Sequence, residues 1–325
     1  MQRDMTAYDV FNGDADGICS LIQLRRAEPI ESVLVTGVKR DINLLKCVEA
    51  EAGDQITALD ISFQKNNTDV SRLLGDGASV LYIDHHNPGE LFEDPNLEAC
   101  IDTSSEVCTA LIVNQRLGGK YQNWAITAAF GDNLSAVATA LAQRSGLSQE
   151  ETELLQTLGV CINYNGYGAS LDDLYFYPDE LYRLMYRFDC PFEFIEAEKN
   201  VFDTLTKGYQ GDMAKAHSLP LHSETSDAAA VMLPDEKWAR RVSGVFGNDL
   251  ANQSPNRAHA VITQKPCGAY QVSVRAPLNN KTGADELVGQ FPTGGGRKGA
   301  AGINVLPAEL LTQFIAAFER QYAQD

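Results

Sequence analysis

Four short groups of acidic residues and histidines contain the side chains of this sequence that are best suited to chemistry. They are Asp14 and Asp16 in the Gly-rich turn 12–17, Asp60 after the apolar run 56–59, Asp84-His85-His86 after the apolar run 80–83, and Asp132 in Gly131-Asp132-Asn133. Three of the four groups stand at or just after strand-like segments. Carboxylates combined with a histidine are the donors that a two-metal hydrolytic centre requires.

Each group has a plainer interpretation when it is taken alone. The string N-x-D-x-D-G at 12–17 also opens a calcium-binding EF-hand loop, but that loop needs Glu at its twelfth position, where Gln23 stands. It also needs a preceding helix, and residues 8–11 are strand-like. A second alternative is a turn that only caps the helix starting near Gly17. An Asp or His that ends a strand is often structural, so it is the combination that favours a metal centre.

The elements that must position these residues are strands alternating with helices. Short β-branched or apolar runs at 8–11, 33–38, 56–61 and 80–83 predict strands, and helical periodicity at 17–26 and 41–52 lies between them. This alternation predicts an α/β fold, with a parallel sheet, helices on both faces and functional residues at the carboxyl ends of the strands. Residues 105–160 read as mostly helical, with helices at 106–117, 121–130, 136–145 and 149–158.

The second half of the chain predicts a smaller α/β domain. Strands are expected at 229–233, 258–263 and 270–275, and an amphipathic helix at 307–322. We therefore expect a catalytic domain at 1–200, a linker at 201–230 and a substrate-binding domain at 231–325. The aromatic, Gly-containing segment 163–168 reads either as a lid over a base or as an exposed turn.

Charge and cysteine content narrow the function classes. The net charge is −18, and residues 1–230 hold 36 Asp and Glu against 16 Lys and Arg. Such an acidic body argues against binding a long nucleic acid, which requires Lys and Arg to neutralise phosphates. Seven cysteines without C-x-x-C spacing favour a reducing cytosol. Residues 1–5 do not resemble a leader, and no apolar window is long enough for a membrane span.

The order D-x-D-G, Asp after a strand, D-H-H and Gly-Asp-Asn resembles the four motifs of the DHH phosphoesterase superfamily. The string Gly294-Gly295-Gly296-Arg297-Lys298-Gly299-Ala300-Ala301-Gly302 is similar to the Gly-rich signature of its DHHA1 subdomain. The resemblance covers nearly the whole chain. It implies two metal ions, the first bound by Asp14, the second by Asp16, His85 and Asp132, with Asp60 bridging both. It also implies that Asp84 orients His85 and that His86 points at the phosphate, so these two residues have catalytic roles.

The chain departs from the superfamily at the first ligand position, where Asn12 stands instead of the common His or Asp. The first metal is then expected to be weaker, more hydrated, or bound only with substrate. Oxygen-rich sites with one imidazole favour Mn²⁺, with Mg²⁺ or Co²⁺ as alternatives and Zn²⁺ less natural.

The Gly-rich segment 294–302 is interpreted as a backbone nest for an anion rather than a flexible linker. Many relatives have a His after the three glycines, and here Arg297 and Lys298 stand there instead. Arg297 is expected to bind a terminal phosphate or a base edge, and Arg275 is expected to be a second phosphate clamp.

These observations predict a phosphodiesterase that cleaves 5′-phosphorylated dinucleotides to mononucleotides in a cleft between two lobes. Relatives act on very short RNAs and on the linear products of cyclic dinucleotide signals, including cyclic di-GMP. The acidic composition favours pGpG over pApA, because guanine offers more hydrogen-bond donors. Three alternatives remain: a single-strand 5′ exonuclease, an inorganic pyrophosphatase, and a nucleotide-binding regulator with impaired chemistry. The expected partner is a small nucleotide, with no membrane and no long nucleic acid, and a homodimer is left open.

Overall fold

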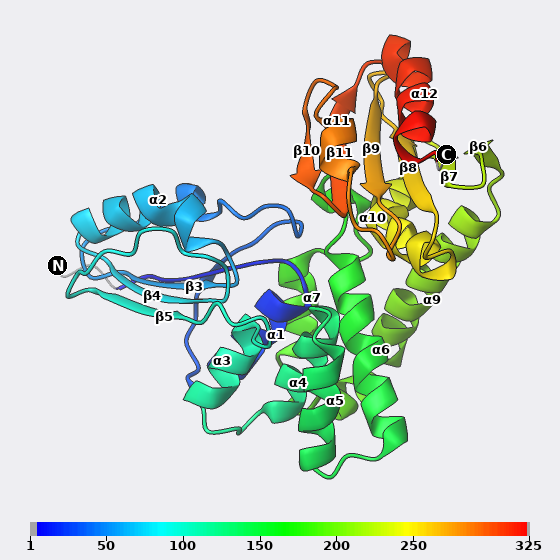
Figure 1. Ribbon diagram of the computed structural model, residues 1–325. Coiled ribbons are helices and arrows are strands. Elements are labelled where there is room, and N and C mark those ends of the chain that lie inside the picture. The colour runs from blue at the N-terminus through cyan, green and yellow to red at the C-terminus, as the bar shows by residue number, and fades with distance from the viewer. Residues whose placement is uncertain (1–4, 324–325) are drawn as a thin grey trace. The chain divides into compact units, whose positions relative to one another are not determined.

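The computed structural model describes residues 5–323 of the chain. The chain folds into two compact units, and the boundary between them falls between Gly208 and Tyr209 (Figure 1). This boundary lies inside one helix, α9 (Lys199–His217). The expectation that no leader precedes the first strand concerns mainly residues 1–4, which lie outside the described residues.

The first unit contains a five-stranded, entirely parallel sheet with the order β2-β1-β3-β4-β5. Its strands are β1 (Ala7–Phe11), β2 (Val33–Val35), β3 (Gln55–Leu59), β4 (Ser79–Asp84) and β5 (Leu97–Ile101). The register pairs Phe11 with Leu59 and Leu59 with Ile83. The residues that follow these three positions therefore emerge at the same level of one sheet edge, which is where the sequence predicts the functional side chains.

Helices cover both faces of this sheet (Figure 1). One face packs on α2, and side chains of β1, β3 and β4 alternate with period two so that Val10, Ala58 and Tyr82 join the same buried cluster as Val70 and Leu73 of α2. Helices α1 and α3 contact the sheet as well. The helices of this unit up to the boundary helix are α1 (Ala15–Ala27), α2 (Phe63–Gly75), α3 (Thr109–Arg116), α4 (Gln122–Gly131), α5 (Ser135–Arg144), α6 (Gln149–Asn165), α7 (Pro178–Met185) and α8 (Pro191–Ala197). Two 3₁₀ turns, η1 (Leu45–Cys47) and η2 (Leu171–Asp173), complete it.

The predicted helix at 41–52 is wrong, since only η1 forms there. Side chains of α2 bind the backbone that a helix would have paired with itself. Asn66 accepts from Leu45 N and donates to Ile42 O, and Arg72 donates to Leu45 O and Val48 O. Periodicity alone could not reveal these two distant partners.

Two further differences concern missed or misplaced elements. The edge strand β5 was not predicted, because none of its residues is buried and Glu98 interrupts its apolar residues. The segment 163–168 is not an exposed turn, since five of its six residues are buried. Asn163, Tyr164 and Asn165 are the buried last residues of α6, and both amide groups are hydrogen-bonded.

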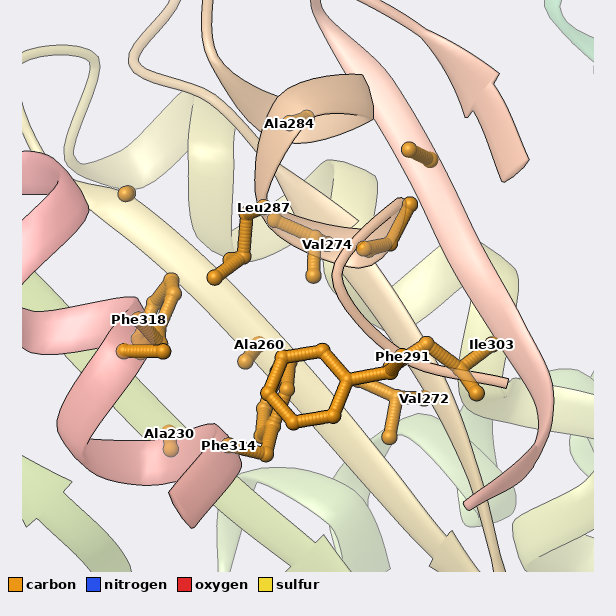
Figure 2. Close-up of a cluster of buried hydrophobic side chains, with 14 of the residues drawn as sticks. Ala230, Ala260, Val272, Val274, Ala284, Leu287, Phe291, Ile303, Phe314 and Phe318 are labelled. Carbon is orange, nitrogen blue, oxygen red and sulfur yellow. The ribbon is translucent and has the colours of Figure 1, made fainter. Parts of the chain in front are cut away.

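The second unit contains a six-stranded mixed sheet with the order β10-β11-β9-β8-β7-β6, in which only β7 and β8 are parallel. The strands are β6 (Leu221–Glu224), β7 (Ala228–Leu233), β8 (Ala258–Gln264), β9 (Tyr270–Arg275), β10 (Gly294–Arg297) and β11 (Ala300–Leu306). Its helices are α10 (Lys237–Gln253), α11 (Ala284–Val288), the 3₁₀ turn η3 (Ala308–Leu310) and α12 (Leu311–Tyr322). Figure 2 shows the core between the sheet and the helices α11 and α12, in which Phe291, Phe314 and Phe318 are the largest side chains. Helix α10 packs on the opposite face through Trp238, Val242 and Phe246.

Residues 201–230, expected to be a linker, are ordered elements instead. They contain most of α9, all of β6 and the start of β7. Val201 and Leu205, four residues apart, are buried on α9, and Asp212 of α9 forms a 2.8 Å ion pair with Arg241 of α10. The composition of this segment is small and polar because few residues of α9 are buried, and the helix was therefore not predicted. No helix among residues 5–323 is long and apolar enough to cross a membrane.

Candidate metal centre

Asp14 and Asp16 lie where β1 turns into α1. Asp14 is the N-cap of α1, and its Oδ1 accepts hydrogen bonds from Asp16 N and Gly17 N. The turn is tight, because a Cβ on Gly17 would lie 2.1 Å from the carbonyl oxygen of Asn12. The helix-cap interpretation of this motif is therefore correct for Asp14, whatever else it binds, and β1 stands where an EF-hand would need a helix.

Asp16 is held by the start of another helix. Its two carboxylate oxygens accept hydrogen bonds from Thr109 N at 2.8 Å and Ala110 N at 2.7 Å, in the first turn of α3. The positive end of α3 stabilises this buried carboxylate and fixes its orientation. No pattern in the sequence predicts this contact, since 93 residues separate Asp16 from Thr109.

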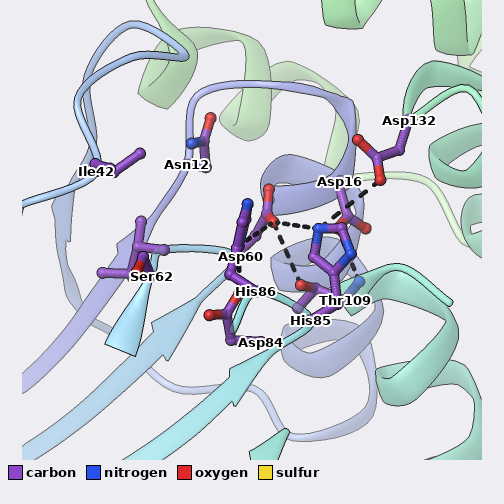
Figure 3. Close-up of polar contacts among 12 residues, drawn as sticks. Asn12, Asp16, Ile42, Asp60, Ser62, Asp84, His85, His86, Thr109 and Asp132 are labelled. Carbon is purple, nitrogen blue, oxygen red and sulfur yellow. Dashed lines mark hydrogen bonds and ion pairs between the residues drawn. The ribbon is translucent and has the colours of Figure 1, made fainter. Parts of the chain in front are cut away.

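Asp60 follows β3 with a left-handed backbone, at φ 56°. This conformation costs a non-glycine residue about 1 kcal/mol or more and is concentrated at functional sites. The Asp60 carboxylate is almost completely buried and points into the group formed by the histidines (Figure 3). Burial raises the pKa of Asp60 well above its ordinary value, and the charges of Asp16 and Asp14 raise it further.

The imidazole of His85 faces three carboxylates. Its Nδ1 lies 3.0 Å from the carbonyl oxygen of Val107, which can only accept, so Nδ1 bears the proton and Nε2 offers a lone pair. That Nε2 lies 3.5 Å from Asp60 Oδ1 and 3.8 Å from both Asp16 Oδ2 and Asp132 Oδ2 (Figure 3). Four such atoms facing one another form a site that could hold a cation.

Asp132 reaches the group from the C-cap of α4. Its side chain is 22% exposed, compared with 4% for Asp60 and 1% for Asp16, so solvent reaches the group on the side of Asp132. Burial raises the pKa of Asp132 to about 6, and the neighbouring charges of Asp16 and Asp14 contribute. The electrostatic potential at this edge of the sheet is therefore negative.

Asp84 does not orient His85, and this expectation is wrong. Asp84 Oδ1 lies 2.7 Å from Nδ1 of His86, while His85 is oriented by Val107. The two imidazole rings lie side by side, with centroids 4.5 Å apart, and both are within 4.0 Å of Asp60 Oδ1. The hydrogen bond with Asp84 raises the pKa of His86, whose side chain is 44% exposed.

Lys39 and Asn163 belong to the same edge and were missed. The ammonium group of Lys39 forms an ion pair with Asp14 Oδ2, lies 2.8 Å from Asn163 Oδ1 and is 4.0 Å from Asp132 Oδ1. Burial by itself lowers the pKa of Lys39, but the charge of Asp14 outweighs it, so the pKa is raised. Lys39 follows β2, the neighbour of β1, so the rule that strand ends meet at one edge could have found it.

The predicted substrate residues of the second unit are found on or beside two of its strands. Arg275 ends β9, and its guanidinium contacts Asn248, Ser273 and Gly244 O. The glycines do not form a nest, and this expectation is wrong, because Gly294, Gly295 and Gly296 belong to β10 and pair with β11 in a hairpin. Gly296 has φ 150°, and a Cβ there would lie 2.4 Å from Ala301 Cα, so close strand packing explains this glycine. Arg297 and Lys298 are exposed at the hairpin turn on the edge of the sheet.

The donor atoms fit a divalent cation. Asp16, His85 and Asp132 each offer one ligating atom within 4.8 Å of the others, and so do Asp60, His85 and His86. Octahedral or nearly octahedral ions with ligands at about 2.1 Å need donor atoms at such separations. Oxygen donors with one or two imidazoles suit Mn²⁺, Mg²⁺ or Co²⁺.

Comparison by sequence finds no matching family model and no matching curated protein. Solved structures do match. The exonuclease RecJ bound to manganese aligns with a TM-score of 0.65 at 17% identity, over 97% of this chain and 89% of that one. The DHH domain of a member of the s1p family of ribosomal proteins aligns at 0.60 and 13%, over 98% and 86%. The chain has the DHH-domain fold.

A third structure has the same fold. The pGpG-specific phosphodiesterase PggH from Vibrio cholerae aligns with a TM-score of 0.58 at 14% identity, over 97% of this chain and 98% of that one. These alignments confirm the α/β fold class and the likeness to DHH proteins. At such identities the likeness is one of fold, and activity must be argued from the site.

Proposed function

We propose that this chain is a divalent-metal-dependent phosphodiesterase that hydrolyses short linear 5′-phosphorylated dinucleotides to mononucleotides. The observation that carries the proposal is the position of His85 Nε2, which faces the carboxylates of Asp16, Asp60 and Asp132 at 3.5–3.8 Å. The fold supports it, since RecJ is an exonuclease and PggH a pGpG-specific phosphodiesterase.

The residues of the centre divide the work. Asp16, Asp60, His85 and Asp132 would hold the cation, which when bound would activate a water and neutralise charge on the phosphate. His86 is half exposed beside them. Because its Nδ1 is hydrogen-bonded to Asp84, its Nε2 points elsewhere and would donate a proton or a hydrogen bond to a phosphate oxygen. Asp84 would keep His86 protonated and oriented.

The expected metal is Mn²⁺, with Mg²⁺ or Co²⁺ as alternatives. The likeness to DHH proteins implies two ions. Direct support from the geometry is strongest for the ion bound by Asp16, His85 and Asp132, because Asp14 belongs to neither group of ligating atoms among the described residues.

In the second unit, Arg297 and Lys298 are proposed to bind a terminal phosphate. Both are exposed, and neither side chain has a hydrogen bond or ion pair with another residue of the described part of the chain. Arg275 is a weaker candidate, since its guanidinium already contacts Asn248 and Ser273. We propose pGpG over pApA, because an acidic protein offers acceptors for the N1 and N2 donors of guanine.

The test is a chromatographic time course of purified protein with Mn²⁺ and a panel of pGpG, pApA, a cyclic dinucleotide, a five-nucleotide RNA and pyrophosphate. Rapid conversion of pGpG to mononucleotides with the longer RNA spared is the expected result. Equal loss of the longer RNA would make the protein a general short-RNA exonuclease. Release of phosphate from pyrophosphate alone would make it a pyrophosphatase. No cleavage of any compound would leave a nucleotide-binding regulator.

A further inference from the structure

We propose that the ammonium group of Lys39 fills the position of the first metal ion, so that the resting centre binds one divalent cation instead of two. This inference rests on the proposed metal-dependent function and deepens it. It concerns residues that follow β1 and β2, at the same sheet edge as the other candidate ligands of the unit.

Both carboxylate oxygens of Asp14 already have partners within the first unit. Oδ1 caps α1 through Asp16 N and Gly17 N, and Oδ2 forms the ion pair with Lys39. Asp14 also belongs to neither of the two groups of closely spaced ligating atoms found among residues 5–323. A metal ion at Asp14 Oδ2 would have to displace the ammonium group of Lys39, whereas the backbone donors on Oδ1 would not exclude one, just as those on Asp16 do not.

The second argument is that Lys39 is fixed by its own backbone. Lys39 N donates to Gly166 O at 2.8 Å, and Lys39 O accepts from Asn12 Nδ2 at 3.0 Å. The amide nitrogen of Asn12 thus holds the backbone of Lys39, while Asn12 Oδ1 is buried without a hydrogen-bond partner among the described residues. The backbone of Lys39 is therefore anchored at both its N–H and its carbonyl group.

The third argument is the set of groups around the ammonium nitrogen. Besides Asp14, Nζ contacts Asn163 Oδ1 at 2.8 Å, lies 4.0 Å from Asp132 Oδ1 and 5.8 Å from the ring centroid of Tyr167. These are acceptor atoms and a π face, all of which favour a cation. Lys39 faces Asp132 Oδ1 whereas His85 faces Asp132 Oδ2, so the ammonium group and a divalent ion would use different oxygens of this carboxylate. Lys39 supplies one fixed positive charge, and a single divalent ion at Asp16, Asp60, His85 and Asp132 supplies the rest.

The experiment counts the metal without using activity. Wild-type protein is equilibrated with excess Mn²⁺, freed of unbound metal, and examined by elemental analysis and by electron paramagnetic resonance. We expect one Mn²⁺ per chain with the six-line spectrum of an isolated ion. Two ions with an exchange-coupled spectrum would overturn the inference and leave the proposed function intact. No bound Mn²⁺ would overturn both.

The variant Lys39→Met tests the cause. It removes the charge at similar length, and we expect a second, weaker Mn²⁺ and the appearance of exchange coupling. Lys65→Met, at an exposed position of α2, is the matched control and should still bind one ion. If Lys39→Met does not fold, Lys39→Gln keeps a donor towards Asp14 and Asn163 and serves the same purpose. A folded variant of Lys39 that still binds only one ion at high Mn²⁺ would show that Lys39 does not exclude the second.

Discussion

The two sets of candidate functional residues, one in each unit, differ in burial. In the first, the carboxylates of Asp16 and Asp60 are 1% and 4% exposed and are held by a helix terminus and a left-handed backbone. In the second, Arg297 and Lys298 stand exposed at a hairpin turn. Burial and fixed geometry suit bond cleavage, which needs ligands in place before the substrate arrives. Exposed, long side chains suit binding, whose strength is set only when the ligand orders them.

The largest loss of activity should follow a substitution of Asp60, which is buried and has a left-handed backbone. Asn tolerates the left-handed backbone, so Asp60→Asn removes the charge and keeps the shape. We expect loss of Mn²⁺ binding and a fall in kcat on the order of 10³-fold, corresponding to several kcal/mol of metal-derived stabilisation.

The same variant should raise the stability of the metal-free protein. The pKa of Asp60 is raised in the folded state, so its ionisation at neutral pH opposes folding, and Asn removes that cost. A higher Tm without metal, measured by calorimetry at pH 7, checks this sign. If Asp60→Asn keeps its affinity for Mn²⁺, the buried carboxylates of the first unit are not the metal ligands, and the contrast with the second unit does not hold.

Asp84→Asn should have the next largest effect. Loss of the hydrogen bond at 2.7 Å lowers the pKa of His86 and frees its ring, and we expect kcat to fall by about 10- to 100-fold. The pKa of His86 is followed by an NMR titration. The double variant Asp84→Asn/His86→Gln should be no worse than His86→Gln alone. If the two changes instead add and Mn²⁺ affinity falls, Asp84 acts through His85 after all.

His259 tests the second unit by pH. It is buried on β8, and burial, together with the charge of Arg257, lowers its pKa from the ordinary 6.5 to about 4. The unfolded chain therefore binds the proton first as the pH falls, and stability is lost between about pH 6.5 and pH 4. His259→Gln should recover about 2 kcal/mol of the unfolding free energy that is lost between pH 7 and pH 5.

The measurement for His259 is denaturant unfolding at both pH values. His222→Gln, at an exposed position of β6, is the control and should change little. An equal acid loss in His259→Gln and wild type would contradict the prediction and would place acid sensitivity in the first unit, with its crowded carboxylates.

Arg297→Ala should give the smallest effect of the four. One lost charge-assisted contact with a phosphate is worth about 1.5 kcal/mol, so KM for pGpG should rise roughly tenfold with Mn²⁺ binding unchanged. Arg320→Ala on α12 removes an equally exposed charge and should leave KM unaltered. If Arg297→Ala lowers kcat and leaves KM unchanged, Arg297 contributes to the cleavage step and not to substrate binding alone.

The sequence predicted the parts of this structure that depend on local pattern. Strands β1, β3 and β4 follow from apolar runs, and their parallel alignment brings the residues after them to one edge. What it could not predict depends on distant partners: the replacement of a helix at 41–52 by contacts with Asn66 and Arg72, and the ion pair of Lys39 with Asp14. The Asp84 assignment was wrong for the same reason, since His85 is oriented by the carbonyl oxygen of Val107, a partner 22 residues away.

Asp14 and Asp16 each hold the first turn of a helix, α1 and α3 respectively. A lineage that lost hydrolysis would still be selected to keep both acids, because folding needs them. Asp132 has no such second duty, since its carboxylate meets only His85 and Lys39 among the ion pairs of the described residues. Whether a related chain keeps Asp132 is therefore a better indicator that it still hydrolyses substrate than whether it keeps the D-x-D-G motif.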